Sequence, residues 1–88
     1  MLYLVALNPD SLVAQSDAAT YLSSISETCW NGLEGIWFVK SDRTAVEIRD
    51  ELRRIVGPND RVAVAFLAGF AAWHGFDDES EKWLLKHL

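Results

Sequence analysis

The chain has 88 residues, of which 50% are hydrophobic and 24% are charged, with only five glycines and two prolines. These proportions exclude a disordered or collagen-like chain, and the length predicts a single domain spanning residues 1–88. Eight Lys and Arg against thirteen Asp and Glu give a net charge of −5, which disfavours a general nucleic-acid-binding surface because phosphate backbones need a basic face.

Cysteine content and hydropathy predict the compartment. Cys29 stands alone, so neither an internal disulfide nor a cysteine-built zinc site is possible. No apolar stretch approaches the length of about 18 residues that spans a membrane, and the first residues lack the order of a signal peptide. We therefore expect a cytoplasmic protein without a membrane partner.

The first third of the chain predicts a strand followed by a helix. Residues 2–7 are a short apolar run typical of a β-strand, and the Asn-Pro-Asp sequence after them supplies turn chemistry that ends it. Apolar residues at helical spacing then predict a helix over 17–27, with Ser16 as its N-cap.

A hairpin and a second helix follow. Residues 29–39 contain two extended pieces with a short link between them, which predicts a hairpin with Gly35 either in the link or in a bulge. The spacing of Thr44 and Glu47 predicts a capping box at the start of a helix over 45–56. A glycine and a proline directly after this helix predict its end.

The last third predicts a strand over 62–67 and a helix that Asp77 opens and that runs to Leu88. The apolar segment 68–76 either turns back as a short strand or crosses the edge of the sheet. The order is therefore β-α-β-β-α-β, which predicts a ferredoxin-like α+β sandwich. In this arrangement two helices cover one face of a four-stranded antiparallel sheet, and a short C-terminal helix follows.

The predicted strands do not alternate between apolar and polar residues, as a sheet with one solvated face requires. Both faces should then be buried, and two helices can cover only one, so we predict a homodimer in which the C-terminal segment helps to cover the other. The alternative is a monomer that exposes a few aliphatic residues, several of them alanine. Large aromatic residues often anchor interfaces, and three are expected at the dimer interface: Trp37, Phe66 and Trp73.

Several segments resemble the SinR-like small ferredoxin-like proteins, which are distantly similar to the second-Cas-protein family associated with CRISPR. The matching segments run over nearly the whole chain: residues 2–7 ending near Asn8, residues 35–40, the helix 44–55, residues 59–64 and the terminus 83–88. The resemblance implies the same ferredoxin-like fold. For the SinR-like relatives it implies no activity that can be carried over to named residues.

The resemblance also implies an alternative function. Nuclease members of the wider family place an Asp at the end of the first strand, and two such carboxylates of a dimer hold a divalent metal that activates water. Asn8 matches that position here, and an Asn is a poorer ligand for Mg²⁺ than a carboxylate. Asp10 could replace it as the metal ligand if the turn folds back. Asn8 and Asp10 are thus the strand-end catalytic candidates.

Other charged groups carry weaker patterns. Arg49, Arg53 and Arg54 form the main basic concentration and are nucleic-acid-binding candidates, but acidic residues interleave with them, and Asp50 is spaced to pair with Arg54. This interleaving favours a solvated, salt-bridged helix face. The acidic residues 77–81 lack EF-hand spacing, which favours a capped helix over a metal loop.

Motifs that carry chemistry are otherwise absent from the sequence. His74 and His87 lack a second metal ligand at helical spacing, and no phosphate-binding glycine loop, Ser-His-Asp order or H-E-x-x-H motif is present. The sequence therefore predicts a small homodimeric binding or regulatory module without a catalytic constellation or a cofactor. A Mg²⁺-dependent nuclease is the alternative.

Overall fold

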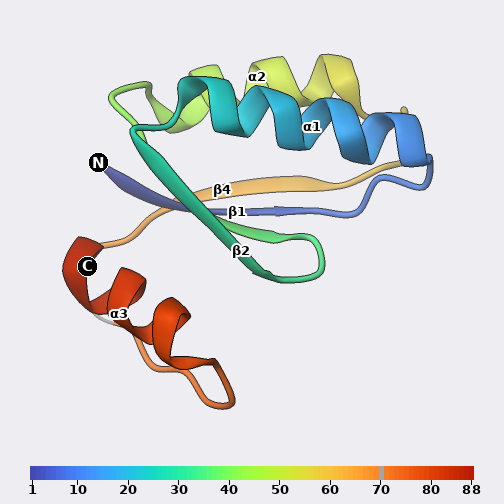
Figure 1. The fold of residues 1–88 in the computed structure, drawn as a ribbon. Helices are drawn as coiled ribbons and strands as arrows, with labels where there is room; N and C mark the ends of the chain where they lie inside the picture. Colours follow the sequence, from blue (N-terminus) through green and yellow to red (C-terminus); the bar gives the residue numbers. More distant parts are fainter. Residues whose placement is uncertain (70) are drawn as a thin grey trace.

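Strand β1 lies inside a four-stranded antiparallel sheet with the order β2-β3-β1-β4. The computed structural model describes residues 1–69 and 71–88. In chain order its elements are β1 (Leu2–Leu7), α1 (Leu12–Ile25), β2 (Thr28–Leu33), β3 (Ile36–Lys40), α2 (Ala45–Ile55), β4 (Val62–Phe66) and α3 (Asp78–His87). Helices α1 and α2 lie on one face of the sheet and α3 on the other (Figure 1). This order confirms the predicted ferredoxin-like α+β fold.

The main core lies between the sheet and the pair α1 and α2. Alternate residues of β1 point into it, because successive side chains of a strand face opposite sides. These buried residues and their partners from β3 and the two helices are Tyr3, Val5, Leu7, Ala18, Leu22, Val39, Ile48 and Leu52. The hydroxyl of Tyr3 donates to the carbonyl of Arg43 at 2.8 Å, so its burial leaves no unsatisfied donor.

Helix α1 begins earlier than the sequence predicted. Its N-cap is Ser11, whose Oγ accepts the backbone N–H of Ala14 at 2.9 Å. The predicted range 17–27 with Ser16 as cap is therefore wrong. The reason is that the helix starts with Leu12 and Val13, which are 80% and 70% exposed and so fall outside the apolar stripe that marked the helix.

The hairpin of β2 and β3 contains both a tight turn and a bulge. Gly35 occupies the turn with φ of 73°, and a Cβ there would lie 2.5 Å from the carbonyl oxygen of Leu7, so only glycine fits. The register shift lies between Trp30 and Leu33 in β2. A Cβ on Gly32 would lie 1.8 Å from the Trp30 ring, which shows how closely that ring covers the backbone.

Helix α2 begins at the predicted residue and ends at Ile55, one residue before the predicted end. Thr44 Oγ1 accepts the N–H of Glu47 at 3.1 Å, and Glu47 Oε1 accepts the N–H of Thr44 at 3.3 Å, which confirms the capping box. After the extended residue Val56, the N–H of Gly57 donates to Asp60 Oδ2 at 2.7 Å. The side chain of Asp60 thus closes the loop into β4.

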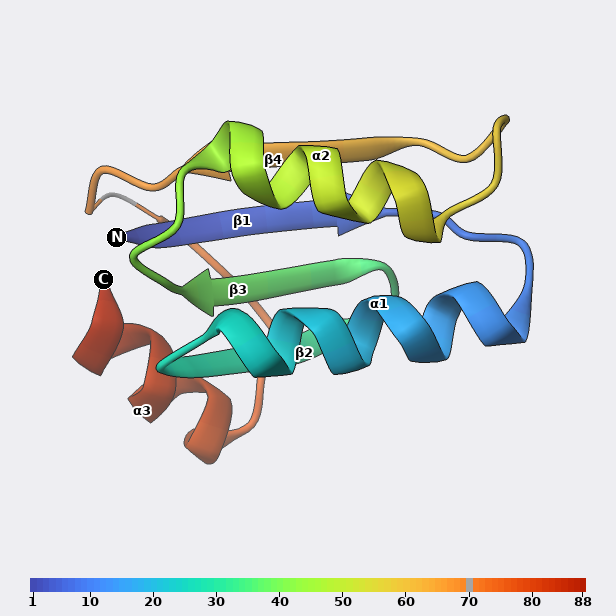
Figure 2. The same cartoon turned by 90° about the horizontal axis from the view of Figure 1, so that it is seen from above.

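The chain after β4 crosses to the far face of the sheet and approaches β2 (Figure 2). The sequence left two courses open for residues 68–76, a short returning strand or a crossing of the sheet edge. The described residues of this segment form no strand, which agrees with the crossing. Phe70 lies outside the described residues. Asp77 caps α3 as predicted, its carboxylate accepting the N–H of Ser80 at 2.8 Å. None of the described helices combines the length and apolar character needed to cross a membrane.

Candidate functional site

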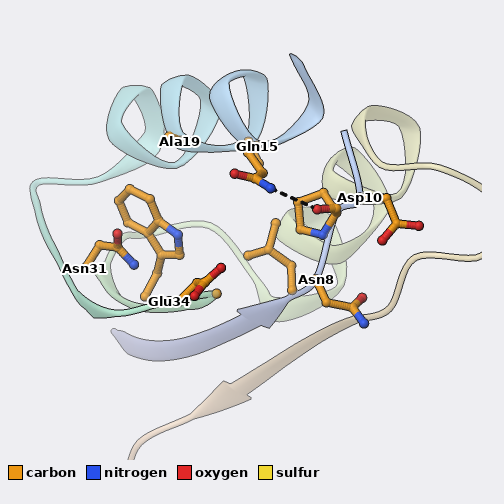
Figure 3. Close-up of a pocket in the computed structure, with 11 residues that line it drawn as sticks. Asn8, Asp10, Gln15, Ala19, Asn31 and Glu34 are labelled. Atoms are coloured by element: carbon orange, nitrogen blue, oxygen red, sulfur yellow. Dashed lines mark hydrogen bonds between the residues drawn. The ribbon is translucent and has the colours of Figure 1, made fainter. Parts of the chain in front are cut away.

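A polar cavity lies where β1 ends, between the start of α1 and the turn of the β2–β3 hairpin. We call it the strand-end cavity; its volume is about 630 Å³. Its lining residues are Leu7, Asn8, Pro9, Asp10, Gln15, Ala18, Ala19, Asn31, Glu34, Gly35 and Trp37. Figure 3 shows Asn8 and Asp10 on one side of it and Asn31 and Glu34 on the other. Both strand-end candidates thus border a single hollow.

Asn8 has a structural partner at this site. Its Oδ1 accepts the backbone N–H of Arg61 at 2.6 Å, and its own N–H donates to the Arg61 carbonyl at 3.2 Å. The side chain therefore extends the pairing of β1 to the residue that precedes β4. An Asn at this position binds backbone, and its carbonyl oxygen is already occupied.

Asp10 is exposed and belongs to the turn between β1 and α1. The neighbouring Gln15 amide donates to the Pro9 carbonyl at 3.2 Å, which ties the helix to this turn. Within the described residues, no group of three or more His, Cys, Asp or Glu side chains is arranged to hold a metal ion. A metal at Asp10 would therefore need most of its ligands from water or from another molecule.

Sequence reasoning missed Glu34 and Asn31 at this cavity. Asn31 Nδ2 donates to the carbonyl oxygens of Leu33 at 3.0 Å and of Ile36 at 2.6 Å, which shapes the hairpin end. The signal that could have found both residues is the antiparallel pairing of β1 with β3, because it brings the start of β3 beside the end of β1.

The second candidate is the sheet face opposite α1 and α2, which we call the open face. Six apolar side chains from β1, β3 and β4 form its central part: Leu4, Ala6, Ile36, Phe38, Ala63 and Ala65. The register also places Lys40 of β3 and Thr28 and Trp30 of β2 on this face. Leu4 lies between Phe38 and Ala65, and Ala6 lies between Ile36 and Ala63, in two cross-strand rows. Of the six central residues, the two alanines of β4 are exposed and the other four are half-buried.

Helix α3 covers only the β2 side of this surface. The Trp30 Nε1 donates to Ser80 Oγ at 2.8 Å, and the Trp83 Nε1 donates to Thr28 Oγ1 at 2.9 Å. The Trp30 ring also lies 4.8 Å from the ring of Phe76, measured between centroids. The C-terminal segment thus covers part of the face, while the β4 side stays exposed.

The three residues expected at an interface lie in different surroundings. Trp37 is on the helix-covered face, where it packs against the main core and lines the strand-end cavity. Phe66 is 58% exposed at the end of β4, with its ring 6.3 Å from that of Tyr3. Trp73 is half-buried in the segment before α3. Phe38 lies on the open face beside Trp30 of β2, with ring centroids 5.4 Å apart, and the alternation along β3 could have indicated that Phe38 and Trp37 face opposite sides.

Two of the three candidate arginines of α2, Arg49 and Arg54, pair with neighbouring carboxylates. Arg49 pairs with Asp50 at 2.8 Å, and Arg54 pairs with Glu51 at 3.1 Å, all at the surface. The predicted pairing of Asp50 with Arg54 is therefore wrong, because each arginine reaches a closer carboxylate. Pairs of this kind offer little free positive charge to a phosphate backbone.

His87 lies against Trp83 in α3, with ring centroids 4.6 Å apart. Burial lowers its pKa below the usual range, and Lys40 and Lys86 lower it further, while Glu27 acts in the opposite direction. The imidazole is therefore mainly neutral near pH 7 and belongs to the packing of α3. His74 is exposed.

Fold and site together define the class as a ferredoxin-like α+β sandwich with one apolar sheet face partly covered. Neither a protein-family model nor a curated protein matches the chain. Among solved structures, the crystal structure of a hypothetical protein TT1823 from Thermus thermophilus is similar to it, with a TM-score of 0.66. The two are 22% identical, and the match covers 85% of this chain and 90% of that one. This likeness supports the fold.

Proposed function

We propose that the protein is a small homodimeric binding or regulatory module whose contacts are made by the apolar open face and the adjoining strand β4. The observation that carries this proposal is the pair of cross-strand rows on the open face, which contain no polar side chain. Monomeric proteins rarely leave a large contiguous apolar patch in water. The resemblance to SinR-like proteins is in keeping with such a module, and the single cysteine favours a cytoplasmic location.

Sedimentation across a micromolar concentration series, with and without Mg²⁺, tests this proposal. We expect a dimer whose dissociation constant does not depend on Mg²⁺. Ala65→Glu should weaken it at least tenfold, because Ala65 is exposed in the single chain and a carboxylate there opposes apolar contact. Val46→Glu is the matched control, since Val46 is 56% exposed on α2, away from the open face. A wild-type chain that stays monomeric contradicts the proposal.

A Mg²⁺-dependent nuclease is the second candidate, favoured by one observation: Asn8, Asp10 and Glu34 border the same cavity. In this case Asp10 would hold the metal, and its counterpart in a second subunit would share it. The wild type should then cleave a nucleic acid only with Mg²⁺, and Asp10→Ala should abolish cleavage. Asn8→Asp is informative because an Asp keeps the acceptor for the Arg61 N–H while adding a charge. Absence of cleavage by the wild type ends this candidate.

A further inference from the structure

The two edge strands of the sheet differ in how they are protected. Strand β2 carries a register shift between Trp30 and Leu33 and contacts α3 through Trp30 and Thr28. Strand β4 pairs with β1 in an unbroken register and contains no charge, proline or bulge between Val62 and Phe66, all within the described part of the chain. Proteins usually blunt an exposed edge with such features, because a plain edge accepts another strand.

The outward backbone groups of β4 follow from its pairing with β1. The N–H of Leu67 donates to the carbonyl of Leu2 at 2.9 Å, and the N–H of Asn8 donates to that of Arg61 at 3.2 Å. In an antiparallel pair the hydrogen-bonding direction alternates along each strand. The N–H and C=O groups of Val62, Val64 and Phe66 therefore point away from β1, and we call these three residues the β4 edge.

We propose that the β4 edge pairs antiparallel with the β4 edge of a second copy of the chain, with Val64 on the two-fold axis. This inference rests on the proposed homodimer and names the contact that forms it. A centre at Val64 sets Val62 opposite Phe66 of the second copy, so all three outward residues of each strand can form hydrogen-bonded pairs. If the two-fold axis passed through Ala63 or Ala65 instead, one of the three outward residues of each strand would lie beyond the end of the partner strand and would have no partner in it.

Side chains agree with this register. Val62 opposite Phe66 is a β-branched and aromatic pair, a combination that stabilises neighbouring strands. It would cover the ring of Phe66, which is 58% exposed in the single chain. Arg61 lies opposite Leu67 of the second copy, so no like charges meet at either end of the pair.

The two-fold axis of such a pair stands perpendicular to the sheet, because residues directly opposite each other point to the same side. The two copies then form one sheet of eight strands with both open faces on the same side. Ala63 and Ala65 of the two chains meet at its centre. This pairing does not cover the open faces; it joins them side by side into one larger apolar surface, which is the binding surface of the module.

Cysteine cross-linking tests the register, in a Cys29→Ser background that removes the native thiol. Val64→Cys should form a covalent dimer on oxidation, because hydrogen-bonded partners lie about 5.5 Å apart between Cα atoms, within the range of a disulfide. Val62→Cys is the matched control, since it is another half-buried valine of the same strand. Its counterpart lies four residues along the strand, roughly 13 Å away, so it should not cross-link to itself. Mixing Val62→Cys with Phe66→Cys should restore cross-linking.

Sedimentation of Phe66→Lys provides a second measurement that does not depend on cysteine chemistry. This change should weaken the dimer at least tenfold, whereas Val46→Lys, at a residue 56% exposed on α2, should leave it unchanged. A wild-type dimer that lacks the Val64 cross-link and tolerates Phe66→Lys overturns the β4 pairing and keeps the homodimer. A monomeric wild type overturns both.

Discussion

The two faces of the sheet carry side chains of the same apolar kind but end in different surroundings. Alternate residues of β1 show this directly, because Leu7 is 7% exposed beneath the helices and Leu4 is half-buried on the open face. Two helices, of 14 and 11 residues, cover the first face, whereas the single ten-residue helix α3 covers only a part of the second. Apolar residues on both faces of a strand therefore indicate that both faces of the sheet are to be buried. The number and position of the helices show which face is left partly exposed.

The most direct test of the difference between the two faces is to replace a leucine by alanine on each of them. Leu7→Ala should lower the free energy of unfolding by about 2–5 kcal/mol, since it removes a side chain of the main core that is only 7% exposed. Leu4→Ala should cost less than half as much in the dilute, dissociated chain, because Leu4 retains contact with water. Urea unfolding at low protein concentration measures both. Equal losses would mean that the open face is packed as tightly as the core.

A smaller loss of stability is expected from a substitution where α3 covers the open face. Gly32→Ala places a Cβ against the ring of Trp30 and should push that ring off Ser80, at a cost of about 1–3 kcal/mol. Tryptophan fluorescence and urea unfolding follow the change together. Leu33→Ala, at a neighbouring residue that is 50% exposed, serves as the control. An unaltered spectrum would show that Trp30 does not depend on the bulge.

The smallest expected effect is a dependence of the local stability of α3 on pH. Because the pKa of His87 is lowered in the folded chain, the unfolded chain binds more protons between that value and the usual value of about 6.5. The contribution of neutral His87 is therefore present above about pH 6.5 and is lost as the pH falls through the lower, folded value. Hydrogen exchange of α3 amides, corrected for intrinsic rates, should show faster opening at about pH 5.5 than at about pH 7.5. His87→Gln should remove most of this difference.

Local signals in the sequence predicted most of the fold. The capping box at Thr44 and the cap at Asp77 were found because a cap depends on residues within one turn of the chain. The start of α1 was missed because Ser11 and Ser16 offer the same chemistry and the exposed Leu12 and Val13 hide the first turn. Ion pairs on α2 were also missed, since several carboxylates compete for each flexible arginine.

Only some of the residues at the candidate sites could be predicted from the sequence. Asn8 and Asp10 were candidates because the resemblance implies a metal ligand at the end of the first strand, but their neighbour Glu34 comes from a hairpin that long-range pairing brings alongside. Likewise, alternation along β3 indicates that Trp37 and Phe38 face opposite sides, but only the packing of the sheet decides that Trp37 lies on the helix-covered face and Phe38 on the open face.

By itself, the sequence determined the order of the elements and the need to cover both faces of the sheet, because helix caps, turns and apolar runs act over a few residues. Tertiary structure alone decided that β4 is an edge strand without a bulge and that α3 lies by β2. Both outcomes depend on strand pairing and packing between segments as far apart as Trp30 and Ser80. No local pattern encodes such contacts, since their free energy appears only when the distant partners meet.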